Sequence, residues 1–452
     1  MVILSFLIKC LISNQLIEME QEDLRHMLEH DSTFKRGQLL NIFWLGFVIY
    51  TLGYTLSVIP NAIYIVSDLM RILGIGLFLT SFCLTLSFRL ENRYLSLMLS
   101  LLMVWAVLVV VRGIDPSYEE IKNSLFNPLN GLFLYLTPLV VLLPKNPNSL
   151  RLLFKVILVL GIAYLGQMAL SSSLILDWEN VDGRDLFEVF VKILGLPCGF
   201  ILMTYNYHRN SHKLLALAVI LITILFAAIR VRRGLLFITG TVLVLAFLIF
   251  LFVNKRKSAL VICSVFAGFF ILVLGLGAFG NSNLDIVNRI KERLEEDTRD
   301  GVELYFYADM EPKDWLVGRG MNGLVAAPPG IDESGDYSGY RNGIETDYLN
   351  IILKGGSISL GLLLLIAIPA MFKGLMFSNN SLSKAAGFWI LIWLLSLYPS
   401  TVTTFSMNYI LVWISIGICY SPSYRGLSEE TLKAYFKGNF EAITEEKELI
   451  EP

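Results

Sequence analysis

The sequence predicts an all-α integral membrane protein with about twelve transmembrane helices and one large outer loop. Of its 452 residues, 55% are hydrophobic and only 16% are charged, whereas soluble domains carry roughly a quarter charged residues. The apolar residues also occur in runs of about 20, long enough to cross a hydrocarbon layer about 30 Å thick. Because both observations concern the whole chain, the prediction of a membrane protein applies to nearly all of it.

The apolar runs divide the chain into two tails, two groups of spans and one loop. The runs lie at 39–60, 65–88, 94–111, 130–144, 152–175, 186–206, 214–229, 234–253, 258–279, 346–372, 385–399 and 402–420, of which the fourth, seventh and eleventh are short. The predicted regions are a tail at 1–38, nine spans within 39–279, a large polar loop at 280–345, three spans within 346–420 and a tail at 421–452. The five cysteines have no metal-ligand spacing, so we expect neither zinc nor disulfides. No small-residue cleavage site follows the apolar start, so we expect no removable signal peptide.

The orientation is predicted from the basic residues of the short loops. With the N-terminus inside, every predicted inner loop contains Lys or Arg, for example Lys255, Arg256 and Lys257. Inner loops of membrane proteins carry such an excess of basic residues. This orientation places both tails inside and the 280–345 loop outside.

Three arginines stand where the orientation rule expects none. Arg230, Arg232 and Arg233 lie between two apolar runs in a predicted outer turn. A single long helix through this region would bury three guanidinium groups in hydrocarbon at a cost of several kcal/mol each, so we predict a hairpin. Arginine binds phosphate oxygens through a planar fork of donors. The turn therefore indicates a phosphate site, although binding of ordinary lipid phosphates or snorkelling to the surface explains the charge equally well.

The predicted outer loop combines aromatic and charged side chains. Trp315 and several tyrosines are interspersed with acidic residues and with arginines that include Arg299. Such a mixture is typical of a sugar-binding surface, and a small packed cap with interfacial tyrosines is the alternative. Repeated glycines at 318, 320 and 323 predict tight backbone turns.

The span that follows the loop begins with acidic residues. Glu345 and Asp347 precede the apolar run, and the helix dipole favours acidic residues there whatever the function. Lys354 is expected to lie below the surface and to reach back to it. The pair Gly355-Gly356 allows a bend or a close approach of helices.

Three of these segments together resemble the O-antigen polymerase and O-antigen ligase family of bacterial glycosyltransferases. Arg232-Arg233-Gly234-Leu235-Leu236 resembles the Ser-Arg-Gly element that opens a span before the large outer loop. Arg299 and the later stretch Trp315-Leu316-Val317-Gly318-Arg319-Gly320 resemble the arginine and the Gly-x-Gly turn of that loop. Glu345-Thr346-Asp347-Tyr348-Leu349 resembles the motif that starts the next span. The resemblance covers roughly residues 214–375 at the level of motifs, and their order is more specific than any one of them.

The resemblance implies a metal-independent, inverting glycosyltransferase of the bacterial inner membrane whose active site faces the periplasm. The donor and the acceptor would be glycans linked to undecaprenyl pyrophosphate, and neither a cofactor nor a nucleic acid is implied. Arginines matching Arg233 and Arg299, together with Arg230 and Arg232, would bind the donor pyrophosphate, an electrostatic role of the kind that often dominates catalysis. Tyr348 and Trp315 are candidate sugar contacts. Membrane lipid is a further partner, and a chain-length regulator protein is left open.

One departure from the family pattern bears on the reaction. Ligases place a histidine where this chain has Glu345, and the four histidines of this chain all lie in the N-terminal tail or a predicted inner loop. This favours a polymerase over a ligase. The base that activates the acceptor hydroxyl would then be Glu345 or Asp347, with Glu345 favoured because it occupies the position of the histidine.

A flippase for lipid-linked sugars is the main alternative outside the enzyme class. Many such transporters have two similar halves joined by a long connection after the sixth span. Here the connection after the sixth span, about 207–213, is short, and the long one follows the ninth span. A non-catalytic membrane scaffold would leave the arginine turn unexplained.

Overall fold

The fold is described from a computed structural model, which covers residues 34–60, 63–86, 90–114, 116–143, 147–177, 180–230, 232–253, 298–326 and 339–437. The predicted ninth span at 258–279, the start of the predicted loop at 280–297, and residues 1–33 lie outside the described residues. The regular secondary structure of the described part is helical, apart from one small two-stranded sheet. This confirms the all-α prediction.

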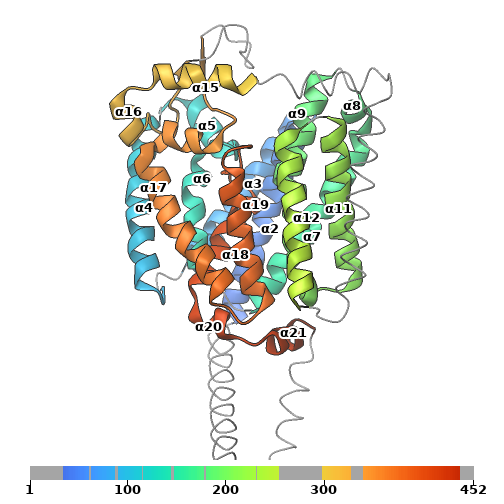
Figure 1. Cartoon of the computed structure of the whole chain (residues 1–452). Coiled ribbons are helices and arrows are strands. Elements are labelled where there is room, and N and C mark those ends of the chain that lie inside the picture. The colour runs from blue at the N-terminus through green and yellow to red at the C-terminus, as the bar shows by residue number, and fades with distance from the viewer. Residues whose placement is uncertain are drawn as a thin grey trace, which may run out of the picture.

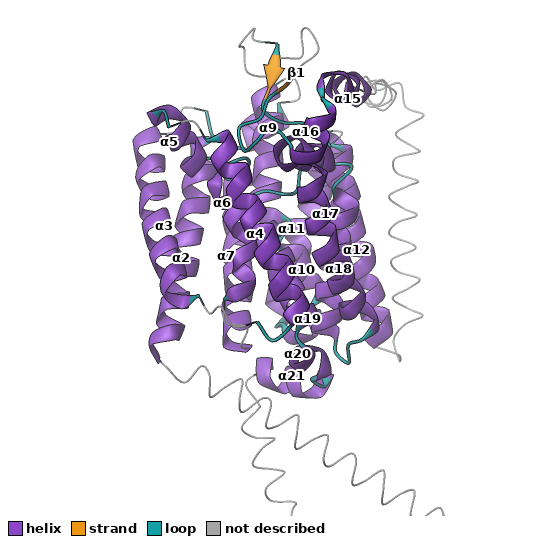
Figure 2. Ribbon diagram, turned by 90° about the vertical axis from the view of Figure 1, so that its left-hand side faces the viewer, coloured by secondary structure: helices purple, strands orange, loops and turns teal. Residues whose placement is uncertain are grey.

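The helices stand side by side in one bundle (Figures 1 and 2). The first half contains α2 (Phe34–Ser57), α3 (Tyr64–Thr85), α4 (Arg93–Gly113), α5 (Tyr118–Phe126), α6 (Leu132–Leu136), η1 (Thr137–Leu142), α7 (Pro147–Leu170), α8 (Ser172–Leu176), α9 (Val181–Phe190), η2 (Val191–Gly195), α10 (Cys198–Met203) and η3 (Tyr205–Tyr207). The second half contains α11 (Asn210–Ile229), α12 (Arg233–Val253), α15 (Thr298–Asp309), α16 (Pro312–Val317), α17 (Asp347–Met376), α18 (Ser381–Ser396), α19 (Met407–Tyr420), α20 (Pro422–Gly426) and α21 (Glu429–Lys437). Strands β1 (Val325–Ala326) and β2 (Tyr340–Arg341) pair antiparallel.

Two ends of the bundle are easily distinguished. Helices α5, α9, α15 and α16 lie at one end, which we call the cap face, and α20 and α21 lie at the other end, which we call the tail face (Figure 1). The arginine turn between α11 and α12 and the start of α17 both belong to the cap face.

Seven helices of the described residues are long and apolar enough to cross a membrane. They are Gly37–Ser57, Tyr64–Thr85, Arg93–Gly113, Asn148–Leu170, Asn210–Ile229, Arg233–Leu251 and Asp347–Met376, and shorter apolar helices lie at Leu132–Leu142, Ser381–Ser396 and Met407–Tyr420. Helices α3, α4 and α11 leave many large apolar side chains exposed, among them Leu69, Leu101 and Leu221. Apolar surface of this extent requires a lipid environment, so the protein is membrane-embedded.

Two predicted spans are interrupted in the structure. The run predicted at 130–144 forms the short helix α6 followed by the 3₁₀ turn η1, which contains Pro138. The run predicted at 186–206 forms α9, the π-helical turn η2 and then α10, with Pro197 just before α10. Proline lacks the backbone N–H that a continuous helix needs, so the two prolines explain why the helices are interrupted near these residues.

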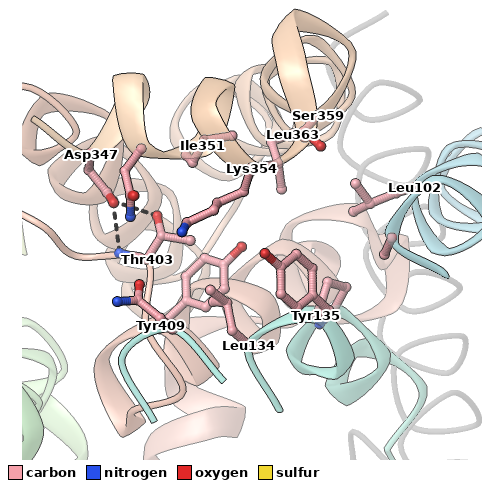
Figure 3. Close-up of a pocket in the computed structure, with 15 residues that line it drawn as sticks. Leu102, Leu134, Tyr135, Asp347, Ile351, Lys354, Ser359, Leu363, Thr403 and Tyr409 are labelled. Atoms are coloured by element: carbon pink, nitrogen blue, oxygen red, sulfur yellow. Dashed lines mark hydrogen bonds between the residues drawn. The ribbon is translucent and has the colours of Figure 1, made fainter. Parts of the chain in front are cut away.

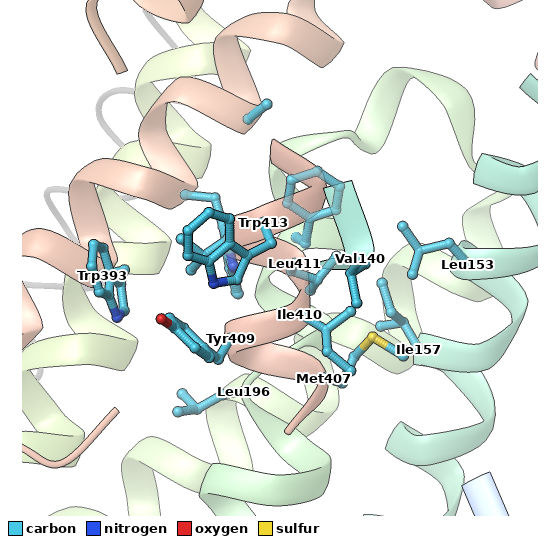
Figure 4. Close-up of a cluster of buried hydrophobic side chains, with 14 of the residues drawn as sticks. Val140, Leu153, Ile157, Leu196, Trp393, Met407, Tyr409, Ile410, Leu411 and Trp413 are labelled. Atoms are coloured by element: carbon cyan, nitrogen blue, oxygen red, sulfur yellow. The ribbon is translucent and has the colours of Figure 1, made fainter. Parts of the chain in front are cut away.

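Aromatic and aliphatic side chains fill the interior between α7, α18, α19 and η1. Trp393, Tyr409 and Trp413 are among the buried rings, and Ile157 and Ile410 pack in the same cluster (Figure 4). This core fixes α18 and α19, and with them the loop at 397–406 that joins the two helices on the cap face.

Candidate functional site

The loop glycines and the paired glycines of α17 form one interlocked unit. Gly356 interrupts α17 with φ 69° and ψ −179°, a conformation essentially restricted to glycine. The bend frees backbone carbonyls, and the loop caps them: the amide of Arg319 donates to the Leu353 carbonyl (2.7 Å) and that of Gly320 to the Lys354 carbonyl (2.9 Å). The bend that the sequence predicted at the glycine pair is thus confirmed, and the predicted loop turn is what binds to it.

The end of α4 closes the other side of this unit. The amide of Met321 donates to the Val109 carbonyl at 3.1 Å. The guanidinium of Arg112 donates to the Val317 carbonyl at 2.6 Å, and the indole of Trp105 donates to the Gly355 carbonyl at 2.9 Å. We call the described residues before α17, 298–326 and 339–346, the cap. These contacts hold the cap between two membrane helices that are far apart in the sequence.

Lys354 is part of the same unit and does not reach back to the surface. Only 6% of the residue is exposed. Its Nζ donates to the Gly323 carbonyl (2.8 Å), to the Asn342 carbonyl (3.0 Å) and to the Asn342 side-chain oxygen. The expected snorkelling is wrong because the cap supplies three acceptors above the lysine. Its role in the fold is to bind the two ends of the cap to α17.

Arg319 connects several residues within the cap. Its guanidinium forms ion pairs with Asp309 (2.5 Å) and Asp314 (2.8 Å) and also donates to the Leu324 carbonyl. Burial lowers the pKa of Arg319, but the hydrogen bonds and charges of the two aspartates outweigh burial and raise that pKa above its ordinary value. Arg319 is therefore fully charged and structural.

The arginine turn is a hairpin on the cap face, as predicted, but its three arginines have different surroundings. Arg230 is 5% exposed and donates to the backbone carbonyls of Leu174, Ile175, Asp177 and Asn180 at 2.7–3.4 Å. These bonds occupy its Nε and both terminal nitrogens. Arg230 was predicted to bind pyrophosphate, and the structure instead gives it the role of fixing the segment between α8 and α9.

Arg232 and Arg233 lie nearer to the surface. Arg232 forms ion pairs with Asp185 (2.9 Å) and Glu188 (3.0 Å), and Glu188 also pairs with Lys192 (2.6 Å). Arg233 opens α12 and is exposed. Of the three predicted phosphate ligands in this turn, Arg233 is therefore the most accessible, and Arg232 stands beside it in a network that contains two acidic side chains.

The two candidate carboxylates at the start of α17 differ sharply in burial. Asp347 is fully buried, and its Oδ2 accepts hydrogen bonds from the amides of Val402 (3.1 Å) and Thr403 (2.8 Å) and from the Thr403 hydroxyl (2.6 Å). Glu345 is exposed on the cap face. Glu345 is therefore accessible to a large molecule and Asp347 is not, so the geometry separates two residues that the sequence left as alternatives.

The 397–406 loop brings the arginine turn and α17 together. A Cβ added at Gly234 would lie less than 3.0 Å from the Pro399 carbonyl oxygen, so the start of α12 packs directly on this loop. The same loop accepts the amide of Tyr348 at the Leu397 carbonyl (3.1 Å) and supplies Thr403 to Asp347. Two motifs more than a hundred residues apart therefore contact the same loop on the cap face.

A small, largely apolar cavity with a few polar side chains lies beneath the first turns of α17 (Figure 3). Its volume is about 70 Å³, enough for a few water molecules. Asp347, Asn350 and Lys354 line it on one side, and Tyr135 and Tyr409 line it on the other. The Oδ1 atoms of Asp347 and Asn350 are buried without a hydrogen-bond partner, and water in the cavity would satisfy them.

The two predicted sugar contacts lie in one aromatic group. Trp315 stacks on Tyr307, with ring centroids 5.8 Å apart and planes 11° apart. The hydroxyls of Tyr307 and Tyr348 are 3.5 Å apart, and Tyr348 stacks with Tyr398 at 6.5 Å and 16°. Tyr398 could not be predicted from the sequence, because only the fold places the 397–406 loop beside the cap.

The remaining predicted site residue, Arg299, belongs to α15, but its side chain lies outside the described residues. Within the described part of the chain, no group of three or more His, Cys, Asp or Glu side chains is placed to hold a metal ion.

Comparison of the chain with protein-family models, curated proteins and solved structures gives no match. The functional assignment therefore rests on the resemblance of the motifs and on the way the fold brings these motifs together.

Proposed function

We propose that this protein is a polysaccharide polymerase that transfers a growing glycan from undecaprenyl pyrophosphate to an incoming lipid-linked repeat unit on the outer face of the bacterial inner membrane. The observation that carries the proposal is the meeting of the arginine turn and the start of α17 at the 397–406 loop, beneath a cap of aromatic and charged residues. These are the segments that resemble the O-antigen polymerase and ligase family. A scaffold protein has no need for this convergence.

In the proposed reaction Glu345 takes the proton of an acceptor sugar hydroxyl. The hydroxyl oxygen then forms a bond to the anomeric carbon of the donor, and the bond between that carbon and the pyrophosphate oxygen breaks. The electron pair leaves with the lipid pyrophosphate, and attack from the opposite side inverts the anomeric centre. Glu345 is favoured as the base because it is exposed, whereas Asp347 is fully buried.

The arginines would stabilise the negative charge that develops on the leaving pyrophosphate. Arg233 is assigned the main role because it is exposed at the start of α12, where the helix dipole also favours an anion. Arg232 and Arg299 are assigned supporting roles. Asp347 acts as a positioning residue, since its carboxylate fixes the 397–406 loop against α17.

The proposal is tested by the length of the surface glycan in a strain that lacks its own copy of the gene. The strain is complemented with wild type, Arg233→Ala, Arg233→Lys or Glu345→Gln, and membrane levels of each protein are matched. Lys313→Ala serves as the control, because Lys313 is an exposed cation of the cap outside the proposed site. We expect wild type and the control to restore long chains, and the other three variants to leave a single repeat unit attached.

Other outcomes of this experiment would support a different function or a different site. If the deletion removes even the single attached unit, the protein is a ligase or a flippase. If Arg233→Ala and Arg233→Lys both polymerise normally, the arginine turn is a lipid anchor and the proposed site is wrong. A defect in Arg233→Ala that Arg233→Lys restores would mean that charge alone matters and that the planar fork of arginine does not.

A further inference from the structure

Four aromatic rings form a continuous row across the cap face. The row runs from Trp315 on α16 to Tyr307 on α15, then to Tyr348 on α17, and ends at Tyr398 in the 397–406 loop. Three separate parts of the chain thus contribute to one feature. Buried Phe306 packs edge-on against both Tyr307 and Trp315 and supports this end of the row from below.

The row is accessible and ends beside the arginine turn. Tyr307 is 47% exposed and Tyr398 is 62% exposed. Tyr398 precedes Pro399, whose carbonyl packs against Gly234 at the start of α12. A ligand held at Arg233 can therefore extend from the turn along the rings toward the cap.

The chemistry of the row fits an extended carbohydrate. The C–H faces of sugar rings pack on aromatic rings, and tyrosine hydroxyls at the ring edges form hydrogen bonds with sugar hydroxyls. The two stacked pairs have centroid spacings of 5.8 and 6.5 Å, comparable with the length of one monosaccharide. The two pairs are joined at the Tyr307 and Tyr348 hydroxyls, so together they extend over more than one sugar.

The geometry points to a binding track for the growing glycan along Trp315, Tyr307, Tyr348 and Tyr398. The track holds several consecutive sugars of the chain and so keeps the product bound between successive additions. This inference rests on the proposed polymerase function for its role in the cell, but binding of a free glycan to the rings is independent of catalysis.

Binding is tested with full-length protein in lipid nanodiscs. The probes are oligosaccharides of one repeat and of several repeats, released by mild acid from the surface glycan of the host, and binding is measured by saturation-transfer NMR. We expect wild type to bind the longer probe more tightly. The double variant Tyr307→Leu/Tyr398→Leu should lose this length dependence and bind the longer probe roughly tenfold more weakly.

Three comparisons give the test its controls. Tyr305→Leu changes an exposed tyrosine of α15 outside the row and should bind as wild type does. Tyr307→Phe/Tyr398→Phe keeps the rings and should retain most of the affinity, which excludes misfolding as the cause of a loss. Arg233→Ala should bind free oligosaccharide normally even where polymerisation fails.

Chain length in the complemented strain gives the second readout. The double leucine variant should still add the first repeats but should produce several-fold fewer long chains. Unchanged binding together with unchanged chain length would overturn the track. If wild type fails to polymerise while the rings still bind the long probe, the proposed function is wrong and the track stands.

Discussion

Replacing Gly356 by alanine should loosen the cap from the membrane bundle. Gly356 has φ 69° and ψ −179°, a region that L-residues other than glycine occupy at a cost of roughly 1–3 kcal/mol. The new Cβ would also lie 2.5 Å from the Val317 nitrogen and still closer to the Leu316 carbonyl oxygen. Both obstacles are backbone atoms, so no side chain can move aside.

The two effects add because one concerns the torsion angles and the other concerns packing. Overpacking against backbone neighbours costs roughly 1–3 kcal/mol, so the total destabilisation is about 4 kcal/mol. The backbone can relieve it by moving the 316–320 segment away from α17. That movement would break the hydrogen bonds from Arg319 and Gly320 to the carbonyls of the bend.

The assay combines thermal unfolding in detergent with limited trypsin digestion. Gly356→Ala should lower the midpoint by several degrees and should speed cleavage after Arg319, whose backbone amide is bound to α17 in the wild type. Gly361→Ala is the matched control: it lies in the same helix, nothing lies within 4 Å of its added Cβ, and alanine favours the helix by about 1 kcal/mol.

Two outcomes would refute this reasoning. If the Gly356 and Gly361 variants unfold at the same temperature, the bend is not under the constraint described. If Gly356→Ala is destabilised without faster cleavage after Arg319, the strain is absorbed within α17 and the cap does not depend on the bend.

Two further predictions concern stability. Burial first, and then the charges of His212 and Lys213, lower the pKa of His208 to about 3. The unfolded chain, with a pKa of about 6.5, binds a proton that the folded chain does not. The contribution of His208 to the free energy of unfolding is therefore complete above about pH 6.5 and falls by up to about 1.4 kcal/mol per pH unit as the pH drops toward 3. Thermal unfolding at several pH values should show a shallower dependence of stability on pH for His208→Gln than for wild type. Equal slopes would contradict the assignment. Asp347→Ala leaves two buried amides without a hydrogen-bond acceptor and should cost roughly 3 kcal/mol or more of stability. Thr403→Val removes one hydroxyl contact and should cost about 1 kcal/mol. Equal losses in the same assay would show that the amides do not depend on this carboxylate.

The sequence predicted features that depend on local composition. Apolar runs identified the membrane helices, the cost of burying arginine predicted the hairpin at 230–233, and the glycine pair predicted the bend. Each of these inferences needs only neighbouring residues. The two spans that are interrupted near Pro138 and Pro197 also carry a local signal, the prolines themselves, which the prediction from apolar runs did not use.

Roles that depend on distant partners could not be predicted. Arg230 looks like its neighbours in the sequence, and only the carbonyls at 174–180 make it structural. Glu345 and Asp347 stand two residues apart, yet the 397–406 loop buries one and leaves the other exposed. The sequence predicts that Lys354 reaches back to the surface, because nothing near it in the sequence shows that the cap supplies its acceptors. The reaction itself stays a prediction.

The interlock at Gly356 also determines which pieces of the chain can be exchanged. The loop at 318–321 binds both the bend of α17 and the end of α4 near Gly113. A chimera that takes only the cap from another protein would lose the surfaces on which that cap is seated. Exchanging the cap therefore requires transplanting three separate segments together, the end of α4, the cap and the first turns of α17, as one module that is discontinuous in the sequence.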